Sequence, residues 1–285
     1  MKETLLCCRI TAQEKGLYRL CHDGVEQAAQ VSGKFQYEAL GPSDYPTVGD
    51  EVLADLNGGG QAVIHKVLPR KSLFLRKAAG TAREEQPVAA NVDILFLCMA
   101  LNNDFNLRRL DRYRAAAWNS GATPVVVLTK ADLCGNPSEK VAAVEEAAPG
   151  TDVLLTSAAQ EDGIRPLLPY LTPGRTVAFV GSSGVGKSTL MNGLLGKEIL
   201  ATGGLRNDDR GRHTTTRRQM FFLPGGAALI DTPGMRELGL WDSESGLETA
   251  FADIEALARQ CRFQDCRHEK EPGCAVRAAL ASGEL

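Results

Sequence analysis

A glycine-rich segment in the second half of the chain has the composition of a phosphate-binding loop. Residues 181–188 are Gly-Ser-Ser-Gly-Val-Gly-Lys-Ser, which matches G-x-x-x-x-G-K-[ST], and an apolar strand is expected directly before it. Glycines let backbone N–H groups turn toward phosphate oxygens, the Lys187 ammonium reaches the β- and γ-phosphates, and the Ser188 hydroxyl can ligate Mg²⁺. The expected contacts with a nucleoside triphosphate are Gly181, Ser182, Ser183, Gly184, Val185, Gly186, Lys187, Ser188 and Thr189.

Further groups for the metal ion are expected downstream. Asp231 begins the sequence Asp-Thr-Pro-Gly after a short apolar run. Such an aspartate holds the Mg²⁺ shell through water, and the backbone N–H of Gly234 can contact the γ-phosphate. A polar stretch between the two motifs contains three consecutive threonines. We expect Thr215 to bind Mg²⁺, with its neighbour Thr216 as the alternative.

A base-recognition motif lies earlier in the chain. Thr-Lys-Ala-Asp at 129–132 follows the apolar run 125–128, and Ser-Ala follows the predicted strand 152–156. The Asp132 carboxylate can accept hydrogen bonds from guanine N1–H and the 2-amino group, which adenine lacks, so GTP is the predicted ligand. The Lys130 stem would cover the base. The expected base-binding residues are Thr129, Lys130, Ala131, Asp132, Ser157 and Ala158.

The order of these motifs is unusual. Regulatory GTPases usually carry the phosphate loop before the base-recognition motif, whereas here residues 129–132 precede residues 181–188. A parallel sheet can host the same site in a permuted order, because strand neighbours rather than chain order fix its geometry. Two separate nucleotide sites are the alternative, which is disfavoured because each half lacks what the other supplies. We therefore expect one GTP site in a circularly permuted domain.

Alternating strand and helix patterns surround these motifs. Predominantly apolar runs at 92–100, 125–128 and 176–180 predict buried parallel strands, and helices are expected over 107–118 and 138–148. A mostly parallel sheet covered on both faces is the predicted core of the central domain.

The N-terminal part of the chain has a different pattern. Short strand-forming runs lie on both sides of the turn Gly58-Gly59-Gly60, which predicts a β-hairpin. Residues 1–72 are therefore expected to form a small all-β domain, with a barrel as the favoured form. The fold class is multidomain α/β.

Four metal-binding side chains are concentrated near the C-terminus. Cys261, Cys266, His268 and Cys274 lie within 14 residues. Three thiolates and an imidazole suit one closed, structural zinc site, and the polar residues between them would make a poor core without it. The spacing departs from that of the common zinc finger, so ordinary buried thiols with an exposed histidine are the alternative. The other cysteines are scattered and are expected to be core or incidental residues.

Composition limits the classes of function. The chain has 285 residues, 44% of them hydrophobic and 24% charged, as in folded proteins of two or three domains. A net charge of −3 argues against nucleic-acid binding through bulk charge, so an RNA contact needs a local patch. The stretch 66–83 is such a patch or a solvated linker, since it has no acid and carries Lys66, Arg70, Lys71, Arg76, Lys77 and Arg83.

No membrane or secretion segment is expected. The longest uninterrupted apolar run, residues 94–101, is too short to span a bilayer. The N-terminus lacks the features of a signal peptide. We therefore expect a cytoplasmic protein with reduced cysteines.

With these motifs, the chain resembles the RsgA or YjeQ family of circularly permuted ribosome-biogenesis GTPases. The likeness includes Asn91-Val92-Asp93, the run Asp-Phe-Asn-Leu-Arg-Arg-Leu-Asp-Arg-Tyr at 104–113, the permuted motifs and the C-terminal cysteines. The resemblance implies an OB-fold RNA-binding domain (1–72), a permuted GTPase domain (73–238) and a helical zinc-binding domain (239–285). It also implies action in late maturation of the small ribosomal subunit.

The sequence after the Asp-Thr-Pro-Gly motif bears on the rate of hydrolysis. Met235 occupies the position of the water-orienting glutamine of Ras-like enzymes, and a thioether cannot do that work. We expect slow intrinsic hydrolysis until a partner orders the loop before strand 220–223. By the resemblance, and because it adjoins the threonine run, His213 is the candidate to position the attacking water; contact with phosphate or RNA is its alternative role. The expected catalytic residues are His213, Lys187 and Thr215.

Two hypotheses of function follow. In the first, the GTP form docks on the immature small ribosomal subunit, rRNA orders the loop, and hydrolysis to GDP and phosphate releases the protein. Its RNA-facing surfaces would be the barrel, the stretch 66–83 and the arginines Arg206, Arg210, Arg212, Arg217 and Arg218. In the second, the protein is a GTP-dependent RNA-binding module or chaperone with incidental hydrolysis. A metabolic kinase is disfavoured by the guanine motif, and a monomer is expected.

Overall fold

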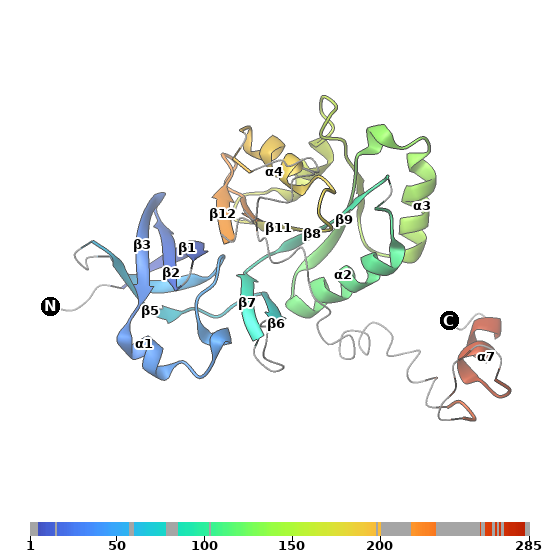
Figure 1. The fold of residues 1–285 in the computed structure, drawn as a ribbon, viewed down its shortest axis with the longest axis horizontal. Coiled ribbons are helices and arrows are strands. Elements are labelled where there is room, and N and C mark those ends of the chain that lie inside the picture. The colour runs from blue at the N-terminus through green and yellow to red at the C-terminus, as the bar shows by residue number, and fades with distance from the viewer. Residues whose placement is uncertain are drawn as a thin grey trace, which may run out of the picture. The chain divides into compact units, whose positions relative to one another are not determined.

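The chain divides into two units, Met1–Trp241 and Asp242–Leu285, which are described separately. The computed structural model describes residues 5–14, 16–56, 60–77, 85–102, 104–197, 199–200, 218–231, 257, 260–263, 266, 268 and 271–282 (Figure 1). Within the first unit the described strands form an 11-stranded sheet and a separate two-stranded sheet.

Five strands near the N-terminus close into a barrel. Leu6–Arg9 pairs with the fourth strand and Arg9–Glu14 with the second, so the first strand joins both ends of the row. The barrel order is β1-β2-β3-β5-β4-β1. A short helix, α1 (Gly33–Glu38), and a 3₁₀ turn, η1 (Pro42–Asp44), connect the third and fourth strands. The strands are β1 (Leu6–Glu14), β2 (Leu17–His22), β3 (Val25–Val31), β4 (Glu51–Asp55) and β5 (Ala62–Val67).

Alternation of side chains explains why these residues form a barrel. Ile10, Leu20 and Ile64 are fully buried in its interior. Thr11 is buried where the register of β1 shifts between Ile10 and Ala12. The other residues beside these three in sequence are partly or fully exposed, as expected when successive side chains of a strand point to opposite faces. The expected N-terminal barrel is confirmed.

A β-hairpin follows the barrel. Strand β6 (Leu73–Lys77) pairs antiparallel with β7 (Glu85–Ala90). Phe74 on β6 is 2% exposed and packs in the core of the next domain. The stretch expected to be a basic patch or a solvated linker therefore includes an ordered strand with a buried face.

The central domain is built on a mostly parallel sheet. Its strands lie in the order β10-β9-β8-β11-β13-β12, and all pair in parallel except β12 with β13. Every residue of β8 and β11 is buried, which fits a sheet covered on both faces. The strands are β8 (Ile94–Ala100), β9 (Thr123–Thr129), β10 (Val153–Leu155), β11 (Thr176–Val180), β12 (Arg218–Phe222) and β13 (Ala228–Asp231).

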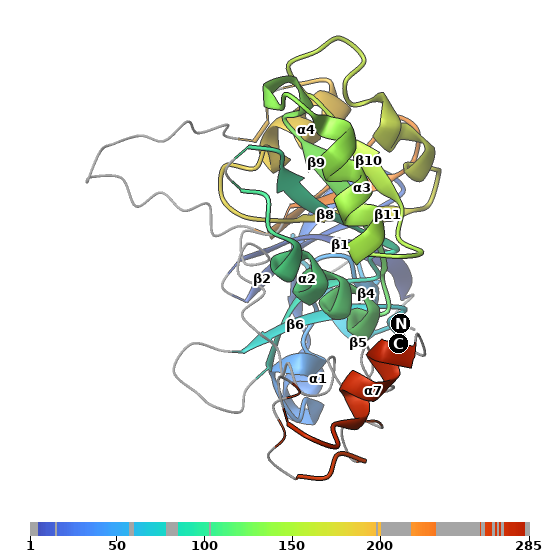
Figure 2. The ribbon, with the colours of Figure 1, turned by 90° about the vertical axis from the view of Figure 1, so that its right-hand side faces the viewer.

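Helices cover both faces of this sheet. Leu110 of α2 (Leu107–Ser120) and Val144 of α3 (Pro137–Ala147) pack against one face. Figure 2 shows these two helices on the same side of β8 and β9. Leu190 of α4 (Lys187–Leu195) and Leu167 of the 3₁₀ helix η3 (Arg165–Tyr170) pack against the other. The predicted circularly permuted α/β fold is confirmed.

The described part of the second unit is small. It contains helix α7 (Ala275–Ser282), whose Val276 and Ala279 are buried. The other described residues of this unit, at 257, 260–263, 266, 268 and 271–274, include a tight Cys/His cluster that is described below.

Candidate GTP and metal sites

The phosphate-binding loop joins β11 to α4 as predicted. Gly181 has φ +149°, and a Cβ there would lie 2.4 Å from the carbonyl oxygen of Cys98. Only glycine therefore lets the loop rest on β8. Gly184 and Gly186 also have positive φ values, at +77° and +103°, where a side chain would add strain. The loop conformation thus depends on the glycines of the motif.

The side chain of Lys187 folds back onto the start of the phosphate-binding loop. Its Nζ donates to the carbonyl oxygens of Gly181 and Ser182 at 2.5 and 2.6 Å. Burial raises the pKa of the Cys98 thiol below the loop to about 12, so this cysteine is a neutral structural residue. The Lys187 ammonium thus lies at the loop that the sequence predicts to bind phosphate.

The base-recognition motif meets the phosphate loop in space. The Thr129 hydroxyl donates a 2.5 Å hydrogen bond to the carbonyl oxygen of Val185, and both residues are buried. Thr129 ends β9. The contact brings together two motifs separated by 56 residues, as expected for one permuted site.

A second contact orients the predicted guanine acceptor. The Ser157 hydroxyl donates to Asp132 Oδ1 at 2.5 Å. The 3₁₀ turn η2 (Ala131–Leu133) carries Asp132, and the Ala131 N–H donates to the Thr156 carbonyl at 3.1 Å. Ser157 is itself 2% exposed. Ser157 thus fixes the Asp132 carboxylate, and the sequence predicts both residues to bind the base.

A glycine fixes the loop that carries Ser157. The Ser157 N–H donates to the Gly163 carbonyl at 3.0 Å, and a Cβ on Gly163 would lie 1.8 Å from the Ser157 carbonyl oxygen. Sequence reasoning did not identify Gly163, because its function depends on a close backbone approach that spacing does not reveal.

Asp231 is the last residue of β13. Because β13 is parallel to β11, its end lies at the sheet edge that carries the phosphate loop. Ser188 is the second residue of α4, which follows that loop, so the predicted oxygen ligands of Mg²⁺, the Ser188 hydroxyl and the Asp231 carboxylate, belong to the same edge of the sheet. The predicted site residues Gly234, His213 and Thr215, together with Thr214 and Thr216, lie outside the described residues.

Asn192 is a site-supporting residue that sequence reasoning missed. Its side chain accepts from the backbone N–H groups of Ile199 and Leu200 at 3.1 and 2.9 Å and donates to the Leu200 carbonyl at 2.8 Å. It thereby ties residues 199–200 to helix α4. A buried asparagine in the second turn of the helix after the phosphate loop was the available signal.

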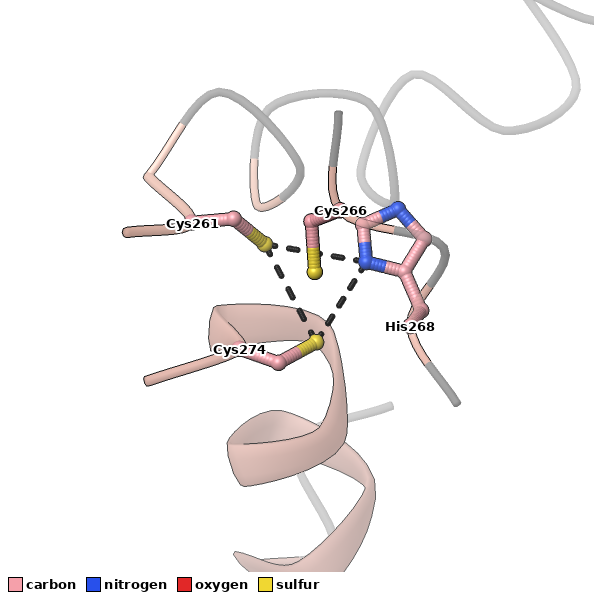
Figure 3. Close-up of side chains that lie close together, drawn as sticks. All are labelled: Cys261, Cys266, His268 and Cys274. Atoms are coloured by element: carbon pink, nitrogen blue, oxygen red, sulfur yellow. Dashed lines mark hydrogen bonds between the residues drawn. The ribbon is translucent and has the colours of Figure 1, made fainter. Parts of the chain in front are cut away.

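The four predicted metal ligands converge in the second unit. The ligand atoms of Cys261, Cys266, His268 and Cys274 all lie within 4.8 Å of one another (Figure 3). His268 Nδ1 is 3.3 Å from the Cys274 sulfur and 3.6 Å from the Cys261 sulfur. A three-sulfur, one-nitrogen set at these separations fits a tetrahedral metal site.

Local backbone geometry supports the cluster. The Arg262 N–H donates to the Gly273 carbonyl at 3.1 Å, which brings together the segments of Cys261 and Cys274. Desolvation alone would raise the pKa of Cys261, but N–H groups of Ala275 and Val276 at the start of α7 donate to its sulfur, and the pKa is lowered. A lowered thiol pKa favours the thiolate that binds a metal.

The pKa of Cys266 is instead raised to about 11. A backbone hydrogen bond at His268 lowers this pKa, but desolvation and hydrogen bonds with Cys274 and Cys261 outweigh it. The convergence of the four ligand atoms therefore carries the assignment. The described residues could therefore hold one metal ion.

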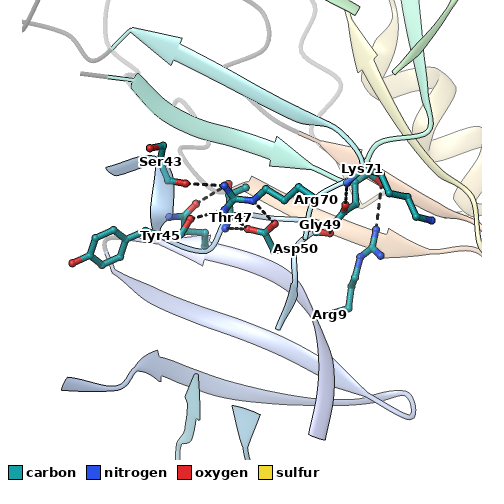
Figure 4. Close-up of polar contacts among 10 residues, drawn as sticks. Arg9, Ser43, Tyr45, Thr47, Gly49, Asp50, Arg70 and Lys71 are labelled. Carbon is teal, nitrogen blue, oxygen red and sulfur yellow. Dashed lines mark hydrogen bonds and ion pairs between the residues drawn. The ribbon is translucent and has the colours of Figure 1, made fainter. Parts of the chain in front are cut away.

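One arginine of the basic stretch has an internal role. Arg70 forms a bidentate ion pair with the fully buried Asp50, at 2.7 and 2.8 Å, and donates to the carbonyls of Ser43 and Tyr45 (Figure 4). Asp50 also accepts from the Thr47 N–H at 2.7 Å. Arg70 is thus engaged within the barrel and does not present a free guanidinium to RNA.

Comparison with known proteins decides the family. The model of the RsgA GTPase family matches residues 67–241. The small ribosomal subunit biogenesis GTPase RsgA 2 of Lactiplantibacillus plantarum is 51% identical over 278 residues, which cover 97% of this chain and 78% of that protein. This chain belongs to the RsgA GTPase family. An RsgA from Opitutus terrae is 47% identical, with 99% of this chain and 80% of that protein covered.

Solved structures agree with an RsgA fold. The crystal structure of YjeQ from Thermotoga maritima has a TM-score of 0.71 and 27% identity, covering 99% of this chain and 93% of that one. YloQ, described as a circularly permuted GTPase, matches with a TM-score of 0.64 at 23% identity, covering 99% of this chain and 90% of that one, and supports the fold alone. The predicted family, the permutation and the GTPase activity are confirmed.

Proposed function

We propose that this RsgA GTPase binds the small ribosomal subunit late in its maturation, hydrolyses GTP to GDP and phosphate on engagement, and is released by hydrolysis. The observation that carries the proposal is the contact between Thr129 and Val185, which supports one guanine-nucleotide site built from both motifs. The relatives at 51% and 47% identity are named small ribosomal subunit biogenesis GTPases.

The proposed roles at the nucleotide follow from the strand ends. Asp132 accepts from the guanine edge, Lys130 covers the base, and the Ala158 N–H donates to O6. Residues 181–189 hold the phosphates, with Lys187 at the β- and γ-phosphates. Ser188, Thr215 and Asp231 are the proposed magnesium-binding residues, and a bound Mg²⁺ would neutralise charge that develops on the phosphates.

Water activation is assigned to the loop outside the described residues. His213 precedes the threonine run, and Met235 stands where a glutamine would orient water in Ras-like enzymes. We assign His213 the positioning of the attacking water once the ribosomal partner orders its loop. Slow hydrolysis without the partner follows from that assignment.

The remaining parts of the chain have supporting roles in the proposal. Residues 1–72 form the RNA-binding OB-fold domain, 73–238 the GTPase domain and 239–285 the zinc-binding domain. Zn²⁺ at Cys261, Cys266, His268 and Cys274 is structural, because four protein ligands leave no open position. The protein acts as a cytoplasmic monomer.

Among the described residues, no helix combines the length and apolar character that crossing a bilayer requires.

Co-sedimentation tests the proposed cycle. Purified protein is spun with small ribosomal subunits in GDP or in a non-hydrolysable GTP analogue, with large subunits as the control. We expect binding to small subunits about ten-fold tighter with the analogue. Asp132→Ala, which cannot hold guanine, should bind equally under both conditions. Equal binding of the wild type with both nucleotides would instead support the RNA-binding or chaperone hypothesis.

A further inference from the structure

The first barrel strand also belongs to the sheet of the GTPase domain. Beyond its pairing with β2, strand β1 pairs antiparallel with β12, with Ala12 opposite Gln219 and Gln13 opposite Arg218. Barrel and GTPase domain therefore share a hydrogen-bonded strand pair rather than a flexible connection.

The register places the β1–β12 pair next to β13, whose last residue is Asp231, at the edge of the sheet that carries the phosphate loop. Gln219 lies opposite Ala12 on one side and opposite Asp231 on the other. With neighbouring strands about 4.8 Å apart, Ala12 and the predicted magnesium-binding Asp231 are separated by about 10 Å across the sheet. The neighbouring register pair, Gln13 with Arg218, lies one residue further along the same two strands.

Side chains reinforce the backbone pairing at this point. Gln13 Oε1 accepts from the Arg218 guanidinium at 3.2 Å and from the buried Thr47 hydroxyl at 3.2 Å. The same guanidinium nitrogen of Arg218 donates to the Pro87 carbonyl on β7. One amide oxygen of the barrel thus fixes the first residue of β12, three positions after Thr215 in sequence.

Two further contacts hold the barrel against neighbouring strands. The Arg9 guanidinium donates to the Thr176 hydroxyl at the start of β11 at 2.9 Å (Arg9 is drawn in Figure 4). Gly49 has φ +92°, and a Cβ there would lie 2.1 Å from the Ala90 carbonyl oxygen and 3.1 Å from Ile230 on β13. Arg9 and Gly49 thus contact β11 and β13, whereas Gln13 contacts the first residue of β12.

We propose that Gln13 is a positioning residue for GTP hydrolysis, which holds Arg218 and thereby the start of β12 beside Asp231. It touches no substrate and acts through Arg218. The inference rests on the GTPase activity of the family and does not depend on the proposed ribosomal partner. It gives the barrel a part in the chemistry in addition to any RNA contact.

Steady-state GTP hydrolysis by the full chain without ribosomal subunits tests this inference. Gln13→Ala is expected to lower kcat about five-fold and to leave KM for GTP within about two-fold of wild type, because the lost bond to a charged group orients the strand and does not bind nucleotide. Gln13→Glu keeps an accepting oxygen for Arg218 and should retain the wild-type kcat. Gln30→Ala is the matched control, since Gln30 lies on the exposed barrel surface, where it donates to Gln61 at 2.8 Å.

A second variant tests the inference if Gln13→Ala does not fold. Arg218→Lys keeps the positive charge, but one ammonium replaces a guanidinium that reaches both Gln13 and Pro87. It should lower kcat by a similar factor, and circular dichroism reports the folded fraction of each variant. The inference is overturned if folded Gln13→Ala has the same kcat as Gln30→Ala. If Gln13→Ala does not fold, the same comparison is made between Arg218→Lys and Gln30→Ala. The inference is also overturned if Gln13→Glu is as slow as Gln13→Ala. Absence of stimulation by small subunits would count against the proposed function only.

Discussion

The hydroxyl of Thr129 donates a 2.5 Å hydrogen bond to the carbonyl of Val185, in the middle of the phosphate loop. The predicted base-recognition motif and the phosphate loop are therefore in direct contact, although the base motif comes first along the chain. The Thr129 hydroxyl supplies the donor that links the two motifs.

Removing this donor should weaken both nucleotides alike. Thr129→Val keeps the branched shape but leaves the buried Val185 carbonyl unpaired, at a cost of about 1–2 kcal/mol. We expect GTP and GDP affinities to fall about ten-fold, measured by titration with fluorescent nucleotides. Thr129→Ser, which retains the hydroxyl, is the control. An unchanged affinity of the valine variant would show that the contact does not support binding.

Base specificity should follow the hydrogen-bonding pattern of residue 132. Asp132→Asn replaces an acceptor with a donor, so guanine loses its partner and xanthine, which has a carbonyl in place of the 2-amino group, gains one. We expect GTP affinity to fall at least about 100-fold and xanthosine triphosphate to become the preferred ligand. Competition binding with both nucleotides measures this change.

Substitution of Ser157, which bonds to Asp132, should weaken guanine binding less than substitution of Asp132 itself. Ser157→Ala removes the 2.5 Å bond that orients Asp132 without altering its acceptor pattern. A loss of about five- to ten-fold in affinity with preserved preference for GTP is expected. If Asp132→Asn still preferred GTP, the base would be recognised elsewhere.

The Cys/His cluster should bind one zinc ion per chain. Cys274→Ser removes one of four ligands and is expected to abolish stoichiometric zinc and to loosen the unit Asp242–Leu285. Elemental analysis and limited proteolysis measure the two effects. Cys7→Ser, at an exposed cysteine on β1, is the control and should keep the metal. Full zinc content in Cys274→Ser would contradict the assigned ligand set.

The Arg70–Asp50 pair should contribute to stability rather than to RNA affinity. Asp50 is fully buried, so Asp50→Ala leaves Arg70 without its carboxylate and is expected to cost about 3–5 kcal/mol in urea unfolding. Arg19→Ala breaks an exposed pair with Glu26 on the same barrel and should cost less than about 1 kcal/mol. Similar costs for the two variants would contradict this role of the buried pair.

Much of the site could be predicted from sequence, because local patterns determine it. The glycines of 181–186 adopt the positive φ values that their loop needs, and the apolar run of β8 forms a fully buried strand. The four Cys and His residues, close in sequence, also lie close together in the structure. What the sequence did not reveal depends on long-range contacts. Arg70 belongs to a stretch that sequence left open as a basic patch or a solvated linker, and its partner Asp50 lies 20 positions away. The pairing of β1 with β12 joins residues more than 200 positions apart.

Ribosomal stimulation of GTP turnover is the decisive property to measure. We expect slow turnover by the protein alone, stimulation of more than about ten-fold by small subunits, and none by large subunits. His213→Ala should bind GTP and small subunits normally but lose the stimulation. Turnover that stays unchanged on addition of small subunits, while GTP still binds, would contradict the proposed function.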